Sequence, residues 1–463
     1  MEYIALDLGS SFTKAAVVNV ETRQIRNVCR QPTPPRLTGL QSDEFEVCPH
    51  QILEIVQTLL DQLVKASPAC HGILLTGQMG GLVLCGPDNQ PVTNYISWQD
   101  RRTTRQHSSG LSWFDRLMAQ VGSRVATELG NEFRPGLGLP LLWYLKQTDQ
   151  LVDQQNLTAL TLPDFVAVSL TQSTPVIEWT CLTGLNSITE PGYATSIFAE
   201  LDLDQFRWPE PVDYRHCVGE YRCRMSSGKS IPVYAATGDH QCSLVGAGLR
   251  QGELSINIAT GSQISMLTAA PESGDYQLRP FFDNSWLKTI TNIPAGRSLS
   301  AIMRLLTEVT EDSVSEQHWQ RFFAAAESTP TSDIDVNLAF FPGAIAGPGH
   351  LSHLTESNLT LGHVARAVLQ QMASQYGQLA SRFSAAEQTS APSTPWDKIL
   401  FSGGLAQTST LLRSLISEAM NAPGRLCDAN QDSLAGMLIL GRVIVGIDDC
   451  VASAIANTLE KGD

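Results

Sequence analysis

Apolar and polar positions follow two different periods along this chain. Tyr3 to Asp7 is a short apolar run that ends at Gly9-Ser10-Ser11, and Thr13 to Val20 is a second run rich in β-branched residues. Such runs, separated by a few small residues, are typical of a strand, a tight turn and a second strand. From Gln51 to Ala66 the apolar residues recur with helical spacing, and Gly72 to Thr76 then indicates a buried strand. This alternation predicts an α/β fold.

The second half of the chain repeats this order of elements. Leu254 to Ile258, the turn from Ala259 to Ser262, and Gln263 to Leu267 form the same strand, turn, strand pattern. Gly261 of this turn follows Gly9 by 252 positions, and a duplicated domain is the simplest account of that spacing, although two unrelated hairpins would look alike. A helix, a strand, a turn and a helix are then predicted at Leu361–Phe383, Lys398–Phe401, Ser402–Gly404 and Thr408–Met420.

The length of the chain supports a division into two domains. A single hydrophobic core stops growing at about 250 to 300 residues, and this chain has 463. We place the boundary after Gly238-Asp239 and before the second hairpin, which predicts domains at residues 1–246 and 247–463.

Composition and charge exclude several classes of function. A hydrophobic content of 43% and a charged content of 17% indicate a globular protein. A formal net charge of −15 argues against a nucleic-acid partner. The stretch from Gly436 to Ile447 is interrupted by Arg442 and is far shorter than the ~20 apolar residues of a membrane span. Ten cysteines without a Cys-x-x-Cys spacing, and a start at Met1-Glu2 without a leader pattern, predict a cytoplasmic protein with reduced thiols.

The first turn offers groups that suit a phosphate. Gly9, Ser10, Ser11 and Thr13 provide backbone N–H groups and short hydroxyls, which can approach phosphate oxygens closely, although an ordinary hairpin has the same composition. Asp7 and Lys14, which flank the turn, are candidates for orienting a metal-bound water and for meeting a transferred phosphoryl group. The P-loop sequence is absent, and no Gly-x-Gly-x-x-Gly follows a strand, so the P-loop and Rossmann folds both lack their motifs.

A carboxylate stands at the end of another predicted strand. Ile231 to Ala236 is a buried strand that leads into Thr237-Gly238-Asp239, and ligands of α/β proteins bind at the carboxyl ends of strands. The residues alone leave three roles for Asp239, which are general base, metal ligand, and N-cap of a helix that begins at His240. We expect His240 to be a neighbouring pocket residue.

Two further loops combine groups that hold polyols. Thr76 to Gly81 contains Gln78 and Met79, and Trp98 to Arg102 contains an indole, an amide, carboxylate and guanidinium groups. Planar polar groups can hold vicinal hydroxyls while an aromatic face covers the carbon chain. The alternative is structural, with Trp98 in a core and Asp100-Arg101 as a surface ion pair.

Taken in order, these segments resemble the motifs of the FGGY carbohydrate kinase family over nearly the whole chain. The similar segments are Asp7–Lys14, Thr76–Gly81, Trp98–Arg102, Gly238-Asp239, Ala259–Gly261 and Gly403-Gly404. The resemblance implies a duplicated, actin-like (ribonuclease-H-like) two-domain fold that binds ATP and Mg2+ in the cleft between the domains. It implies that Asp239 is the catalytic base and that the sugar contacts are Gln78, Met79, Trp98, Asp100, Asp239 and His240. The implied ATP contacts are Gly9, Ser10, Ser11, Thr13, Lys14, Thr260, Gly261, Gly403, Gly404 and Gln407.

Within that family, Asp239–Ser243 and Leu359–Ala367 look most like the sedoheptulokinases. The resemblance therefore implies an ATP-dependent ketose kinase, with sedoheptulose as the first choice of acceptor and xylulose or ribulose as the second. Gly80 stands where ketose kinases usually place His, so a roomier or wetter pocket is expected. A nucleotide-switched ATPase that phosphorylates no sugar is the alternative, since the actin-like fold also serves such proteins. The sequence leaves the oligomeric state open.

Overall fold

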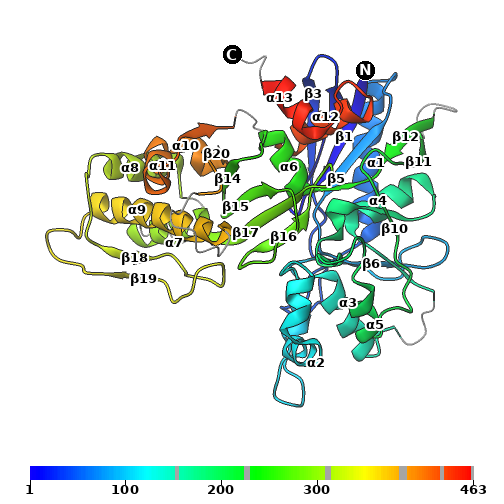
Figure 1. Ribbon diagram of the computed structural model, residues 1–463, viewed down its shortest axis with the longest axis horizontal. Coiled ribbons are helices and arrows are strands. Elements are labelled where there is room, and N and C mark those ends of the chain that lie inside the picture. The colour runs from blue at the N-terminus through cyan, green and yellow to red at the C-terminus, as the bar shows by residue number, and fades with distance from the viewer. Residues whose placement is uncertain (152–155, 224–229, 308–313, 385–393, 428–431, 460–463) are drawn as a thin grey trace.

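The computed structural model describes residues 1–151, 156–223, 230–307, 314–384, 394–427 and 432–459. Figure 1 shows two lobes side by side, with the N-terminal half on the right and most of the C-terminal half on the left. Each lobe contains a twisted sheet covered by helices. Within the described ranges, no helix combines the length and the hydrophobicity that a membrane crossing needs.

The sheet of the N-terminal half has the strand order β11-β12-β5-β1-β2-β3. The bounds are β1 Glu2–Leu8, β2 Phe12–Asn19, β3 Gln24–Pro32, β5 Ile73–Gly77, β11 Cys217–Arg222 and β12 Ser230–Tyr234. β1, β2 and β3 pair antiparallel, whereas β5 lies parallel to β1 and to β12. Helix α1 (Pro49–Ala66) buries the apolar stripe predicted from its spacing, including Ile52, Val56 and Leu63. The predicted strand, turn, strand unit, helix and strand are thus confirmed.

The sheet of the C-terminal half repeats this topology. Its order is β16-β17-β15-β14-β20-β21, with bounds β14 Glu253–Ile258, β15 Gly261–Thr268, β16 Gln277–Pro280, β17 Trp286–Pro294, β20 Lys398–Ser402 and β21 Gly424–Leu426. β14 pairs antiparallel with β15 and parallel with β20, as β1 does with β2 and β5. Helix α9 (Leu361–Ala380) and the short helix η3 (Ser381–Phe383) occupy the range predicted as one long helix. The helix predicted at Thr408–Met420 is α11 (Thr410–Met420), which begins two residues later because Ser409 caps it by accepting from Leu412 N. The short helix α10 (Gly404–Thr408) before it was not predicted.

Smaller elements surround the two sheets. Helices α2, α3 and α5 lie together below the N-terminal sheet in Figure 1 and bury their own apolar cluster, which includes Leu117, Trp143 and Phe198. The other helices are α2 Trp113–Glu128, α3 Gly138–Gln147, α4 Leu162–Thr171, α5 Thr195–Glu200, α7 Gly296–Thr307, α8 Glu316–Glu327, α13 Val451–Leu459, η1 Arg102–Thr104 and η2 Trp179–Leu182. The short strands are β4 Glu46–Val47, β6 Val83–Cys85, β7 Tyr95–Ile96, β8 Thr158–Leu160, β9 Val176–Glu178, β10 Glu210–Val212, β13 Thr237–Gly238, β18 Asp335–Asn337 and β19 His350–Ser352.

A loop of the N-terminal half is tied to the outer strand of the other sheet. Leu278 N of β16 donates to Gly130 O at 2.8 Å, and Asn131 Nδ2 donates to the carbonyl oxygens of Gly274 and Tyr276. Gly130 has a φ of +62°, and a Cβ there would lie 2.3 Å from Leu278 O. Only glycine allows the two backbones to approach so closely, so this contact fixes one edge of the space between the lobes.

Two equivalent helices join the lobes. Helix α6 (Asp239–Ala247) follows the last strand of the first sheet, and α12 (Asp432–Ile444) follows the last strand of the second. A Cβ on Gly246 would lie 1.7 Å from Asp432 O, and a Cβ on Gly436 would lie 2.0 Å from Cys242 O. The helices therefore cross with backbone against backbone at both glycines.

This crossing predicts an asymmetric response to the same substitution in two helices. Gly246→Ala is expected to lower the free energy of unfolding by about 1 to 3 kcal/mol or more, because the added methyl group overlaps Asp432 O. Gly377→Ala in α9 is the matched control, because its Cβ would meet no atom within 4 Å. That change is expected to raise stability by roughly 0.5 to 1 kcal/mol. Urea unfolding measures both, and equal effects of the two substitutions would refute the close crossing.

Candidate active site

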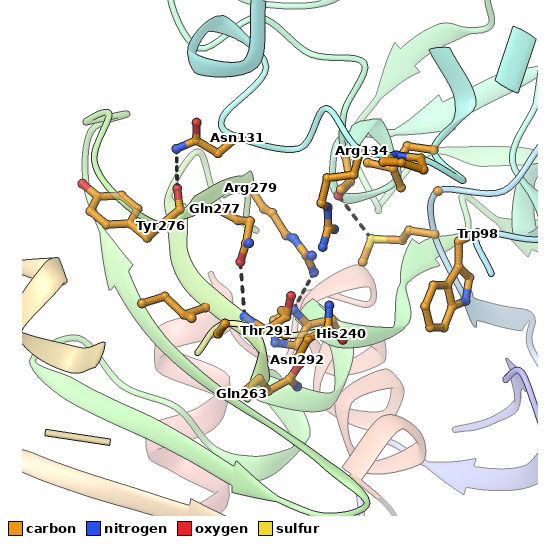
Figure 2. Close-up of a pocket in the computed structure, with 18 of the residues that line it drawn as sticks. Trp98, Asn131, Arg134, His240, Gln263, Tyr276, Gln277, Arg279, Thr291 and Asn292 are labelled. Carbon is orange, nitrogen blue, oxygen red and sulfur yellow. Dashed lines mark hydrogen bonds between the residues drawn. The ribbon is translucent and has the colours of Figure 1, made fainter. Parts of the chain in front are cut away.

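A cavity of about 750 Å³ lies between the two halves, within the range of small-molecule sites. Several of the predicted sugar-site residues line it, together with one residue of the first turn; these are Ser10, Gln78, Met79, Trp98, Asp239 and His240. The second half contributes residues that the motifs did not indicate, namely Gln263, Tyr276, Gln277, Arg279, Thr291 and Asn292. Figure 2 shows the labelled side chains converging on this space from both lobes.

Asp239 is the first residue of α6 and directly follows β13, which pairs with β5. The N-cap of α6 is Gly238, so the N-cap role considered for Asp239 is wrong. Burial raises the pKa of Asp239 to about 6, and the negative charge of Asp7 acts in the same direction. The backbone N–H groups of Asp239 and His240 and the charge of Arg279 partly oppose the rise. The result is a carboxylate whose pKa is close to neutral pH, as a general base requires.

His240 lies beside this carboxylate and is held neutral. Burial and the positive charge of Arg279 hold the pKa of His240 well below its usual range. Its Nδ1 lies 2.9 Å from Arg279 Nη1, and its Nε2 lies 3.3 Å from Ser265 Oγ. Because a guanidinium can only donate, Nδ1 is the acceptor, and Nε2 carries the proton that Ser265 accepts. His240 is therefore a pocket residue that joins α6 to the second sheet.

The structure separates Asp100 from the other predicted sugar contacts. Its carboxylate is fully buried, accepts from Phe45 N at 2.7 Å and from Arg102 Nε at 2.9 Å, and is not among the cavity-lining residues of the described chain. The ion pair is with Arg102 rather than Arg101, and it fixes the loop that carries Trp98. Trp98 itself faces the cavity, so in this arrangement Asp100 supports the wall and Trp98 forms it.

The space beside Gly80 is filled. Gly80 lines the cavity with a φ of +86°, and a Cβ there would lie 2.6 Å from Leu137 Cδ2. The expectation of a roomier pocket is therefore wrong at this point, since Leu137 occupies the volume that a side chain at position 80 would take. The positive φ also disfavours histidine, or any other side chain, on this backbone.

The two predicted phosphate turns have open tips. Ser10 and Ser11 are exposed between β1 and β2, and Thr13 is buried opposite Leu8. In the second turn, Thr260 and Gly261 are exposed, and a Cβ on Gly261 would meet no atom within 4 Å. Each turn thus presents backbone groups without a covering side chain, as contact with phosphate oxygens requires.

The Gly403-Gly404 segment follows β20 in the second half. Gly403 has a φ of +88°, and its Cβ would lie 2.5 Å from Ile258 O, so glycine is required by the backbone itself. Gly404 is exposed, and a Cβ there would meet open space. The Gln407 amide nitrogen donates to Cys427 O at 2.8 Å, which ties α10 to the end of β21. Gly404 is therefore available to a ligand, whereas Gly403 and Gln407 also have structural roles.

Asp7, Asp239 and Lys14 provide charges that suit a magnesium phosphate. Asp7 is buried and accepts from Ser433 Oγ at 2.6 Å. Burial raises the pKa of Asp7, while the Ser433 hydrogen bond and the charge of Lys14 lower it. The described residues include no group of three or more potential metal ligands. Mg2+ commonly needs only one or two carboxylates, since water and substrate phosphates complete its shell, so these residues fit the ion.

Sequence motifs missed an arginine cluster in the wall of the cavity. Arg101, Arg134 and Arg279 all line the cavity, and the buried carboxylate of Glu132 pairs with both Arg134 and Arg279. Arg134 and Glu132 lie in the loop after α2, while Arg279 is on β16, so tertiary folding brings them together. Arg101 belongs to a loop that the sequence predicted as a sugar contact, but no local sequence pattern indicated Glu132, Arg134 or Arg279 as site residues.

Comparison with solved structures identifies the class of this fold. The solved gluconate kinase from Lactobacillus acidophilus matches with a TM-score of 0.85 at 17% identity, covering 98% of this chain and 92% of that one. Plasmodium falciparum glycerol kinase with ADP matches with a TM-score of 0.82 at 16% identity, covering 98% and 92%. These likenesses confirm the predicted actin-like, ribonuclease-H-like fold with its two domains.

The family follows from sequence. Residues 2–246 match the model for the N-terminal domain of the FGGY family of carbohydrate kinases, and the chain belongs to this family. The xylulose kinase of Bacillus subtilis is 27% identical over 277 residues, which cover 57% of this chain and 53% of that protein. The xylulose kinase of Staphylococcus xylosus is 23% identical, with 66% and 64% covered. The chain thus spans about half to two thirds of the length of these relatives. None of these proteins is named a sedoheptulokinase.

A side chain at position 80 is expected to destabilise the fold in two ways, through backbone strain and through overlap with Leu137. Gly80→Ala is expected to lower the free energy of unfolding by about 2 to 4 kcal/mol, because the positive φ is strained and Leu137 must move. Gly110→Ala is the matched control, since Gly110 has a φ of +87° with open space around it. Gly110→Ala should lower the free energy of unfolding only by the backbone strain, about 1 kcal/mol. Thermal or urea unfolding gives both values; a loss at Gly80 no greater than that at Gly110 would show that Leu137 does not fill the site.

Proposed function

We propose that this protein transfers the γ-phosphoryl group of ATP to a hydroxyl of a sugar, with Asp239 as the general base. The observation that carries this proposal is the position of Asp239, in the cavity beside Gln78, Met79 and Trp98, with its pKa raised to about 6. The sugar oxygen attacks the γ-phosphorus, the bond to the β–γ bridging oxygen breaks, and ADP leaves. The hydroxyl proton passes to the Asp239 carboxylate.

The ATP contacts are part of this proposal. We assign the phosphates to the turns Gly9–Thr13 and Thr260-Gly261, whose tips are open, with Lys14 beside the first turn. We assign the adenosine to Gly403, Gly404 and Gln407 at the end of β20. Mg2+ would be held through water by Asp7 and would neutralise charge on the phosphate oxygens. Sugar contacts in the first half and adenosine contacts in the second suit the proposed domains 1–246 and 247–463, which would have to approach for transfer.

The acceptor is proposed to be a short sugar. Several relatives of this chain are named xylulose kinase, which favours a five-carbon ketose such as xylulose or ribulose over the seven-carbon sedoheptulose first expected. The filled space beside Gly80 also argues against a longer carbon chain at that wall. A cytoplasmic location stays part of the proposal, because ATP is the proposed donor and the ten cysteines lack a Cys-x-x-Cys spacing.

The base assignment predicts both a mutant effect and a pH profile. Asp239→Asn is expected to lower kcat by about 10²- to 10⁴-fold, because proton transfer loses its acceptor. In the unsubstituted protein, kcat/KM is expected to fall about tenfold per pH unit below pH 6, because protonated Asp239 cannot accept a proton. A coupled assay of ADP release, with and without sugar, measures both.

The same assay separates this function from a nucleotide switch. Release of ADP that is independent of sugar would support the alternative of a switched ATPase. Turnover of Asp239→Asn close to that of the unsubstituted protein would remove Asp239 from the role of base, and retained sugar binding by the mutant would exclude misfolding as the cause of a loss.

The nucleotide assignment predicts a selective loss of affinity. Gly404→Val is expected to weaken ATP binding about tenfold or more, because the side chain would stand where the nucleotide approaches. Sugar binding by the same variant is the internal control and should stay within about twofold. Calorimetric titration gives both dissociation constants, and unchanged ATP affinity would contradict the placement.

A further inference from the structure

The wall of the cavity carries more positive than negative charge. Among the described residues that line it, the charged groups are Arg101, Arg134, Arg279, Arg382, Asp239 and Asp275. Arg382 pairs with Asp275 at 3.1 Å, which removes one charge of each sign. Three guanidinium groups then face Asp239 and the buried carboxylate of Glu132. This excess is local, because the protein as a whole has a formal charge of −15.

Glu132 cannot neutralise the cluster by itself. Its Oε1 accepts from Arg279 Nε at 2.6 Å, and its Oε2 accepts from Arg134. One carboxylate is therefore divided between two guanidinium groups. The Nε of Arg134 is buried without a hydrogen-bond partner, although an unpaired buried donor is costly. Arg134 therefore lines the cavity as a cation that shares its carboxylate partner with Arg279.

Arg101 adds a second such cation. Its Nη1 donates to the carbonyl oxygens of Trp98, Asp100 and Pro135, which holds the guanidinium between two loops of the first half. Within the described part of the chain, no carboxylate forms an ion pair with it. Burial and the positive charge of Arg134 lower the pKa of Arg101, so the two guanidinium groups repel each other. An anion between them would relieve that repulsion.

The position of this pair favours the acceptor over ATP as its ligand. Arg101 is three residues from Trp98, and Arg134 is three residues from Leu137, which packs on Gly80. In Figure 2, Arg134 and Trp98 lie away from Gln263, the residue that follows the second phosphate turn. The pair therefore belongs to the sugar side of the cavity.

We propose that Arg101 and Arg134 bind a carboxylate of the acceptor, so that a short sugar acid, a polyhydroxy carboxylate of about five or six carbons, is preferred over the neutral five-carbon ketose that the names of the relatives favour. This inference rests on the proposed kinase function and adds the charge of the acceptor to its length. A carboxylate accepts two parallel hydrogen bonds from a guanidinium, which fixes one end of the carbon chain and leaves hydroxyls at the other end for Asp239. The phosphoryl transfer itself is unchanged.

The test compares acids with neutral analogues of equal length. ATP-dependent kcat/KM is measured for xylonate against xylitol and xylulose, for gluconate against glucitol, and for the corresponding keto acids, with D and L forms. The kcat/KM of the best acid is expected to be about tenfold or more above that of the best neutral compound. A neutral compound with a higher kcat/KM than every acid would overturn this inference and leave the proposed kinase function standing. No turnover of any compound would overturn the proposed kinase function as well.

Substitution of one arginine then locates the effect. Arg134→Met is expected to lower the ratio of kcat/KM for the acid to kcat/KM for the neutral compound by about 10- to 100-fold, because KM for the acid rises. Arg134→Lys is expected to retain part of the preference for the acid, because it keeps the positive charge. Arg382→Met lowers the charge of the same cavity by the same amount but leaves the Arg101 and Arg134 pair intact, so the ratio should fall much less than with Arg134→Met. If Arg134→Met raised KM for ATP and left the ratio constant, the arginine would serve the nucleotide and the inference would be wrong.

Discussion

Helices α6 and α12 touch through their backbones, and the geometry of the cleft depends on this contact. Gly246 and Gly436 bring no side chain to the crossing, so the two helix backbones meet at these positions. Asp239 is the first residue of α6, and Ser433, near the start of α12, donates to Asp7 beside the first predicted phosphate turn. The crossing that joins the lobes therefore also sets where the proposed base stands relative to the proposed phosphate site.

Much of the fold could be predicted from the sequence, because each half opens with an apolar strand, a turn of small residues and another strand. These patterns are local, and the hydrophobic burial that they imply is satisfied within one sheet. The short helix α10 was missed, since a helix of five residues gives only a weak local signal. The candidate site was predicted where it follows strand ends, as at Asp239, and was missed where it depends on tertiary contacts, as at Glu132 and Arg279.

Asp100 and Gly80 show why motif residues do not all share one role. Asp100 belongs to the same segment as Trp98, yet its carboxylate is satisfied by Phe45 and Arg102 behind the wall. At Gly80 the motif suggested an empty volume, but the neighbouring Leu137 fills it, which only the packing of a distant segment could reveal. A residue type in a motif thus predicts a location better than it predicts a contact.

The hydrogen bond from Leu278 to Gly130 has a consequence for solubility as well as for the cleft. β16 is the outermost strand of its sheet, and an uncovered edge strand can pair with another molecule and start aggregation. Here the loop at Gly130 and Asn131 occupies that edge. A movement that drew the lobes apart at this loop would uncover the strand. The contact at this loop therefore also protects the chain from self-association.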